Sequence, residues 1–86
     1  MTVKFSGPIK KYTNGETEFN PLNSTTLREL TDELYNRYGK VFKNYITEND
    51  SCLILINGKG TMMSGGLDTP LKPEDIIEIL PVVIAG

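Results

Sequence analysis

Polar and apolar residues alternate in two short segments near the N-terminus, which is the pattern of β-strands with one buried face. The first segment spans residues 2–5, and the second spans 16–20, where Pro21 limits how far a ladder could extend. Between them, residues 9–12 can form one helical turn that stops at Asn14-Gly15. The side chains predicted to face inward from the two strands are Val3, Phe5, Thr17 and Phe19.

The clearest local signal is the start of a helix at Thr26. A threonine hydroxyl and a glutamate three residues later, here Thr26 and Glu29, can satisfy each other's free backbone donors. Apolar side chains then recur at helical spacing, and Gly39 supplies the stop. The pattern predicts a helix with one buried face, formed by Leu27, Leu30, Leu34 and Tyr38.

A second, shorter helix is predicted directly after Gly39. The helical spacing repeats there, although more weakly, before the polar run 47–51. The apolar positions of this predicted helix are Val41, Phe42, Tyr45 and Ile46.

The remaining patterns predict strands. Residues 52–56 are continuously apolar, which is typical of a strand covered on both faces in the middle of a sheet. Asn57-Gly58 favours a tight hairpin turn, so residues 59–63 are expected to return as a short strand. Residues 76–80 form the predicted last strand, and Pro81 ends its ladder.

This order of elements predicts an α+β protein of the β-grasp, or ubiquitin-like, class. We expect a mixed sheet of four to five strands, one main helix packed across it and a short second helix. The crossover through the helices would place a later strand beside the first in parallel. Residues 1–81 form the predicted β-grasp domain, and residues 82–86 are expected to form a flexible C-terminal tail.

Composition narrows the chemistry of this 86-residue chain, which has no histidine, no tryptophan and a single cysteine. Without histidine there is no Ser-His-Asp triad, no Cys-His pair and no imidazole metal ligand, and we expect no metal site. A net charge of -2 offers no basis for holding nucleic acid, and no apolar run approaches the length of a membrane helix. Cys52 cannot form an internal disulfide and is expected to be a buried, inert residue of a cytoplasmic protein.

The order of motifs in the second half of the chain resembles the MoaD/ThiS family of ubiquitin-like sulfur carriers. In that family an Asn-Gly turn follows a buried strand, as at residues 57–58, and a Leu-Lys-x-x-Asp turn opens the last strand, as at 71–75. The chain then runs through a proline, here Pro81, into a glycine tail. Length, the second helical segment and this proline are most similar to the small subunit of molybdopterin synthase.

The resemblance implies that the working group is the C-terminal carboxylate of Gly86. In the family, an adenylating, ubiquitin-activating-like enzyme uses ATP to form an acyl-adenylate, and sulfur then replaces AMP to give a thiocarboxylate. The carrier itself binds no cofactor. In the molybdopterin branch it donates the sulfur within a complex with a larger catalytic subunit, during molybdenum or tungsten cofactor biosynthesis.

A narrow arm that ends in glycine suits a carboxylate that must enter the active sites of other enzymes. An extended apolar segment before it can be held by main-chain hydrogen bonds and buried side chains of the partner. Methionines adapt to irregular surfaces, so two of them are further candidates for partner contact. The predicted partner-binding residues are Pro81, Val82, Val83, Ile84, Ala85, Met62 and Met63.

Ala85 departs from the family, which usually ends in two glycines. Its methyl group narrows backbone freedom, and we expect slower activation rather than none. Two other interpretations stay open: a β-grasp module that binds a partner without being activated, and a ubiquitin-like modifier whose Gly86 is joined to a lysine amine. A thiamine-type carrier is the remaining alternative within the family.

Overall fold

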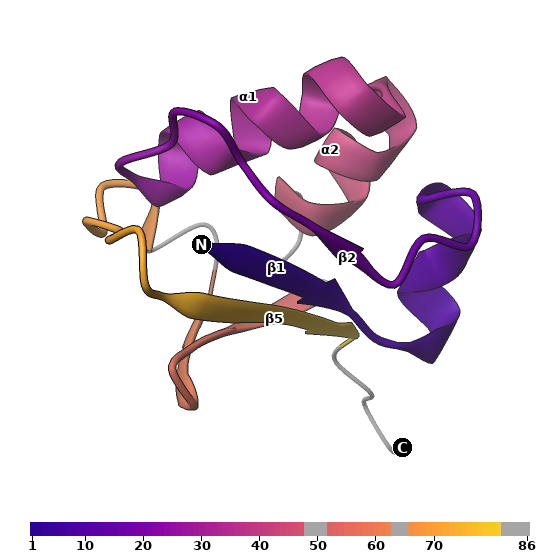
Figure 1. Ribbon diagram of the computed structural model, residues 1–86. Coiled ribbons are helices and arrows are strands. Elements are labelled where there is room, and N and C mark those ends of the chain that lie inside the picture. The colour runs from indigo at the N-terminus through magenta and orange to yellow at the C-terminus, as the bar shows by residue number, and fades with distance from the viewer. Residues whose placement is uncertain (48–51, 63–65, 82–86) are drawn as a thin grey trace.

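The computed structural model describes residues 1–47, 52–62 and 66–81, which form a mixed five-stranded sheet with helices packed on one face (Figure 1). The sheet has the strand order β2-β1-β5-β3-β4. Its strands are β1 (Thr2–Phe5), β2 (Glu18–Phe19), β3 (Cys52–Ile56), β4 (Lys59–Met62) and β5 (Ile76–Pro81). The helical elements are the 3-10 helix η1 (Gly7–Tyr12) and the α-helices α1 (Leu27–Tyr38) and α2 (Lys40–Thr47).

The topology is the predicted β-grasp. β1 pairs in parallel with β5, with Val3 opposite Ile77 and Phe5 opposite Ile79. Parallel neighbours need a crossover, and α1 and α2 lie within the connection between them. β3 is antiparallel to both β5 and β4, so the last strand occupies the centre of the sheet. Neither α1 nor α2 is long and apolar enough to span a bilayer.

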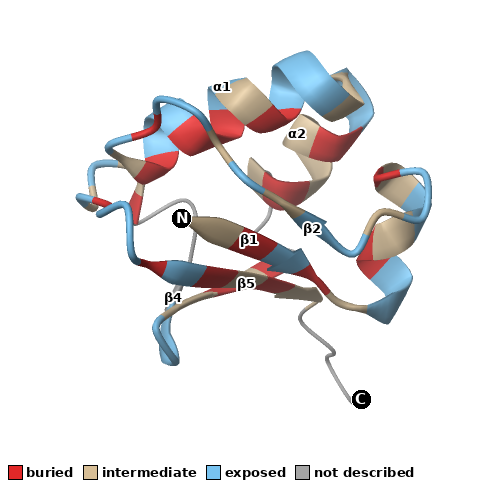
Figure 2. Ribbon diagram, viewed as in Figure 1, coloured by how far each residue is buried: buried red, intermediate tan, exposed pale blue. Residues whose placement is uncertain are grey.

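The core lies between the helices and one face of the sheet, as the buried positions in Figure 2 show. Successive side chains of a strand point to opposite faces, so alternate residues of the three inner strands face the helices. The buried stripe predicted for α1 is confirmed at three of its four positions, while Tyr38 is partly buried. The buried strand residues are Val3, Phe5, Cys52, Ile54, Ile77 and Ile79, and those of α1 include Leu27, Leu30 and Leu34.

Phe42 of α2 is the centre of an aromatic cluster that joins α2 to the rest of the core. Its side chain is 1% exposed. Its ring is stacked on Tyr12 with centroids 5.9 Å apart, and meets Phe5 and Tyr38 edge-on at 5.8 and 5.5 Å. Such pairs stabilise a core beyond the apolar area that they bury. One side chain therefore connects η1, β1 and both α-helices.

The predicted start and stop of α1 are confirmed, with one difference in the cap. The Thr26 hydroxyl accepts a hydrogen bond from the Glu29 N–H at 3.2 Å. The Glu29 carboxylate accepts one from the Thr25 N–H at 2.7 Å, one residue before the position that a full capping box would use. Gly39 ends the helix with φ of 97°, a conformation that favours glycine.

One prediction of an inward-facing side chain is wrong, and one apolar position of the predicted second helix is exposed. The second strand covers only Glu18–Phe19 within the predicted range 16–20, and Thr17 is exposed. β2 lies at the edge of the sheet and pairs only with β1, which has four residues, so few residues are available to pair with it. Val41 is 70% exposed, because the buried face of α2 is formed by Phe42 and Ile46, one turn apart.

The structure also corrects two expectations about the inner strands. β3 has neighbours on both sides, but the helices cover only one of its faces, so Leu53 and Leu55 are half-buried rather than buried. The last strand includes Pro81, which was expected to lie just beyond it. The predicted fourth strand is confirmed for residues 59–62, and Met63 lies outside the described residues.

Candidate functional site

The central strand leads directly to the predicted reactive end of the chain. Pro81, the last residue of β5, is half-buried and lies opposite Cys52 of β3. Residues 82–86 lie outside the described part of the chain, and with them five predicted site residues. What the structure does place is the point from which those residues depart: Pro81 ends the central strand β5, two residues beyond the last pair that β5 forms with β1. The predicted site residues outside the described part are Val82, Val83, Ile84, Ala85 and Gly86, together with Met63.

The sheet face opposite the helices carries an apolar patch beside that point. Leu53 of β3 lies opposite Leu80 of β5, and both are half-buried. Leu55 shares this face, and Ile76, at the other end of β5, is 45% exposed. We call Leu53, Leu55, Ile76 and Leu80 the open-face patch.

A glycine in β4 leaves room beside the patch. A Cβ at Gly60 would lie 3.3 Å from Leu53 Cδ1 and 3.6 Å from Leu55 Cδ2, so a larger residue there would press on both leucines. A glycine inside a strand often marks a place where another chain approaches closely. Met62, predicted to contact a partner, is in register with Leu53, which places it in the same region of the sheet.

Sequence reasoning missed the open-face patch, because it predicted that residues 52–56, which form β3, would be a strand covered on both faces. The sequence nevertheless contained a sign that one face of the sheet is uncovered. Both helical segments lie in one connection, separated only by Gly39, and a single crossover can cover only one face of a sheet. The alternate apolar residues of β3 therefore had to face away from the helices.

The two family motifs meet at the opposite end of β5, where they hold the hairpin turn to the strand. Asn57 and Gly58 have positive φ values of 51° and 85°, as a tight hairpin turn requires. The Asn57 side chain donates to the Asp75 carboxylate at 2.9 Å and accepts from the Ile76 N–H at 2.9 Å. Asp75 also accepts from the Lys72 N–H at 2.8 Å. These motif residues thus have a structural role.

This network makes stability depend on pH through Asp75. The hydrogen bonds from the Lys72 N–H and the Asn57 amide hold the pKa of the Asp75 carboxyl below its ordinary value of 3.8. A carboxyl whose pKa is lower in the folded state stabilises the fold above the ordinary pKa, and this stabilisation is lost as pH falls through the folded value. We therefore expect Asp75→Asn to lower the free energy of unfolding at neutral pH, with a difference from the unsubstituted chain that shrinks below pH 3.8.

Urea denaturation of both chains at a series of pH values measures that difference. Asp68→Asn is the matched control, because Asp68 is exposed and its pairing with Arg28 at 3.1 Å joins two exposed side chains. It should change stability little at any pH. A destabilisation by Asp75→Asn that stays constant across the pH range would contradict the role given to the ionised carboxylate.

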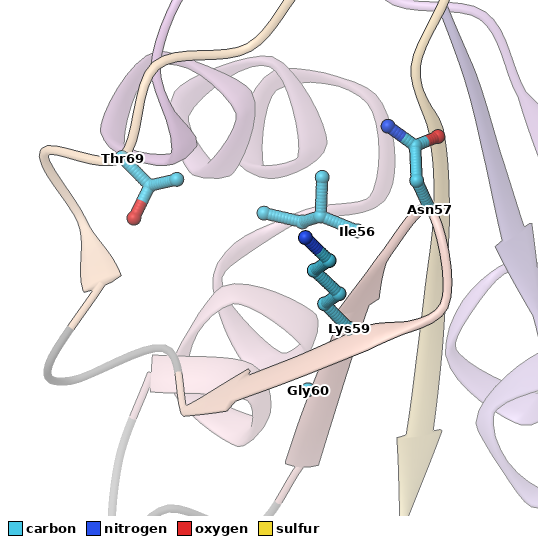
Figure 3. Close-up of a pocket in the computed structure, with 5 residues that line it drawn as sticks. All are labelled: Ile56, Asn57, Lys59, Gly60 and Thr69. Atoms are coloured by element: carbon cyan, nitrogen blue, oxygen red, sulfur yellow. The ribbon is translucent and has the colours of Figure 1, made fainter.

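A surface pocket of about 340 Å³ lies beside the hairpin turn (Figure 3). Figure 3 shows Thr69 across the pocket from Lys59, with the Ile56 side chain between them. Among the lining residues that the structure describes, Lys59 is the only titratable side chain, so these residues do not form the paired groups that acid-base or nucleophilic catalysis requires. Its lining residues are Ile56, Asn57, Lys59, Gly60 and Thr69.

The one cysteine of the chain is not exposed as a nucleophile. Cys52 is fully buried, and burial raises the pKa of its thiol to about 11, so it stays protonated near neutral pH. This agrees with the prediction of an inert cysteine. Across residues 1–47, 52–62 and 66–81, no group of three or more acidic, cysteine or histidine side chains could hold a metal ion.

Comparison with protein families matches residues 3–86 to the family described as "ThiS family". The chain belongs to the ThiS family. The match covers nearly the whole chain and confirms the family predicted from the motifs. No curated protein matches the sequence.

Solved structures similar to this ThiS-family protein come from different organisms and carry different names. One is the small archaeal modifier protein 1 from Methanosarcina acetivorans, with 30% identity, a TM-score of 0.77, and coverage of 99% of this chain and 94% of that one. Another is the BexX/CysO complex of Amycolatopsis orientalis, with 25% identity, a TM-score of 0.77, and coverage of 99% and 98%.

A third similar structure is the complex of subunits 1 and 2 of the molybdopterin-converting factor from Helicobacter pylori. Its matching chain has 32% identity and a TM-score of 0.64, with coverage of 99% of this chain and 96% of that one. Together these neighbours confirm the ubiquitin-like β-grasp fold and the carrier family for this ThiS-family protein. Their names refer to different roles.

Proposed function

We propose that this protein is a sulfur carrier whose C-terminal Gly86 is converted to a thiocarboxylate. The observation that carries the proposal is the family match, which extends through residue 86. The described residues support it, because they supply neither a paired catalytic group nor a candidate metal cluster. Pro81, from which the arm continues, is the last residue of the central strand β5. The carrier lends a backbone carboxylate to enzymes that supply the catalytic groups.

The proposed chemistry takes place at one carbonyl carbon. An oxygen of the Gly86 carboxylate attacks the α-phosphorus of ATP, pyrophosphate leaves, and an acyl-adenylate forms. Hydrosulfide (HS⁻) supplied by the sulfur donor then attacks the acyl carbon, AMP leaves with the oxygen that joined it to the chain, and the sulfur stays on the carbonyl carbon as the thiocarboxylate. The carrier needs no bound cofactor, since ATP is held by a ubiquitin-activating-like, adenylating enzyme. This ATP-dependent step is consistent with a cytoplasmic protein.

Within the family we propose a role in molybdopterin synthesis, with a larger catalytic subunit as the second partner. The similar Helicobacter pylori structure contains two subunits of a molybdopterin-converting factor, which supports this choice. A protein-modifier role is the second candidate, because the archaeal modifier has a sequence identity of 30% and a higher TM-score, 0.77 against 0.64 for the Helicobacter pylori structure. In that role a lysine amine would attack the same acyl-adenylate and form an isopeptide bond.

Mass analysis of the reaction products separates the two roles. The protein should be incubated with a sulfur-carrier activating enzyme and ATP, with and without a sulfur donor, in the presence of a lysine-containing acceptor protein. Replacement of one terminal oxygen by sulfur supports the carrier. A covalent conjugate to the acceptor, without sulfur on the free chain, would favour the modifier.

The open-face patch is proposed as the surface that docks the activating enzyme, with the arm as the second contact. Leu55 is half-buried and opposite Glu78, so Leu55→Lys places opposite charges across the two strands and should leave the fold intact. Loss of an apolar anchor at an interface should lower kcat/KM for thiocarboxylate formation by about tenfold or more. Initial rates of sulfur loading measure this effect.

Val41→Lys is the matched control for this prediction. It introduces the same charge at a residue that is 70% exposed on α2, which packs against the other face of the sheet. Loading of this control should stay close to that of the unsubstituted chain. Equal rates for the two lysine variants would exclude the open-face patch from the docking surface.

A further inference from the structure

The hydrogen bonds between β1 and β5 show where the next bond of the ladder would form. Thr2 donates its N–H to the Asp75 carbonyl at 3.1 Å, and Ser6 donates its N–H to the Ile79 carbonyl at 3.3 Å. In a parallel ladder a residue donates to one neighbour of its partner and accepts from the other. The next donor should therefore be the N–H of residue 81, directed at the Ser6 carbonyl. Residue 81 is a proline, which has no N–H.

The pairing on the other side of β5 confirms the direction of the Pro81 nitrogen. Asn57 donates its N–H to the Ile76 carbonyl at 2.8 Å, which makes Asn57 and Ile76 a hydrogen-bonded pair. Hydrogen-bonded and non-hydrogen-bonded pairs alternate along an antiparallel ladder, so Cys52 and Pro81, five positions on, form a non-hydrogen-bonded pair. The nitrogen of Pro81 thus faces β1, and the proline costs no bond to β3.

The N-terminal strand stops at the same step. The Ser6 carbonyl accepts a hydrogen bond from the Ile9 N–H at 3.0 Å, within the first turn of η1. If β1 continued, its next donor would be the N–H of residue 8, which is also a proline and lies in that first turn. Neither strand therefore has a backbone donor for the next step of the ladder.

We propose that Pro81 is a positioning residue that fixes the boundary between the sheet and the C-terminal arm. This rests on the proposed function, in which residues 82–86 must reach an active site of another protein. Five extended residues span about 17 Å. A bond from an N–H at residue 81 to the Ser6 carbonyl would move the point from which the arm starts by one residue and shorten its reach by roughly 3.5 Å. A misplacement of about 1 Å already matters for a reacting group. Because Pro81 lacks this donor, the β1–β5 ladder ends before residue 81.

Pro81→Ala tests this boundary, because it restores an N–H directed at the Ser6 carbonyl. We expect the amide at position 81 to exchange with deuterium about tenfold or more slowly than an unstructured amide. We also expect sulfur loading to slow by about tenfold or more. Inserting one glycine between residues 81 and 82 of the variant should return loading to within about threefold of the unsubstituted chain, because it restores the reach of the arm.

Two controls distinguish an effect of arm length on sulfur loading from an effect of any proline substitution on the protein. Pro73→Ala changes an exposed proline of the 72–75 turn and should leave loading unchanged. The unsubstituted chain carrying the same inserted glycine shows the effect of a longer arm alone. A thermal unfolding midpoint for Pro81→Ala at or above that of the unsubstituted chain would agree with an added ladder bond.

The proposal is overturned if the amide at position 81 exchanges like an unstructured one, or if the inserted glycine fails to rescue a slowed variant. It is also overturned if Pro81→Ala loads at the unsubstituted rate. Should the unsubstituted chain itself take up no sulfur, the proposed function fails, and deuterium exchange alone decides the boundary. Protection at position 81 would then still support Pro81 as the end of the ladder.

Discussion

A chain that lacks Gly86 is expected to take up no sulfur from the activating enzyme, ATP and a sulfur donor. The deletion moves the terminal carboxylate back by about 3.5 Å and places it on Ala85, whose methyl group crowds the reacting carbon. Because a displacement of about 1 Å can cost roughly a hundredfold in rate, a shift of one residue should bring loading below detection. Intact-mass analysis after incubation measures the loss.

A chain extended by one glycine beyond Gly86 is the matched control for position. It retains every residue but displaces the carboxylate by a similar distance in the opposite direction, so it should load as poorly. Both variants leave the described core unchanged and should unfold at the same temperature as the unsubstituted chain. Sulfur uptake by the truncated chain would show that Gly86 is not the reacting residue.

The largest effect on stability is expected from Phe42→Ala. Phe42 is 1% exposed and contacts Phe5, Tyr12 and Tyr38, so its removal leaves a cavity where three elements meet α2. A buried Phe→Ala substitution costs about 3 to 5 kcal/mol. A domain of this size has a total stability of about 4 to 13 kcal/mol, so the variant should lose much of it. Urea unfolding followed by circular dichroism gives the difference in free energy.

Val41→Ala is the control for this substitution. It changes the adjacent residue of the same helix, but Val41 is 70% exposed and alanine is the better helix former, so stability should change by less than about 0.5 kcal/mol. Similar destabilisation by both substitutions would mean that α2 is not held to the core through Phe42.

Local signals predicted the elements of this fold well. Three of these signals depend only on nearby backbone groups, and all three appear in the structure as expected. They are the capping residue Thr26, the helix stop at Gly39 and the Asn57-Gly58 turn. The order of elements was then sufficient for the β-grasp, because a single crossover dictates the parallel pairing of the first and last strands.

Features that depend on distant parts of the chain were harder to predict. The contacts of Asp75 with Asn57 join residues 18 positions apart, and a turn motif gives no direct sign of them. Leu55 is as apolar as its buried neighbour Ile54, so composition could not show which of them lies on the uncovered face. The sequence pointed to Pro81 as the start of the arm, and Gly86 lies outside the described residues, whereas the open-face patch emerged only from the arrangement of the sheet.

The most direct test of the proposed function is the intact mass of the chain after incubation with activating enzyme, ATP and a sulfur donor. Ala85→Gly should be measured alongside, because it restores the usual glycine pair of the family. We expect both chains to exchange one terminal oxygen for sulfur, the unsubstituted chain more slowly. Sulfur uptake by Ala85→Gly but not by the unsubstituted chain would contradict the proposal and identify a β-grasp binding module that is not activated.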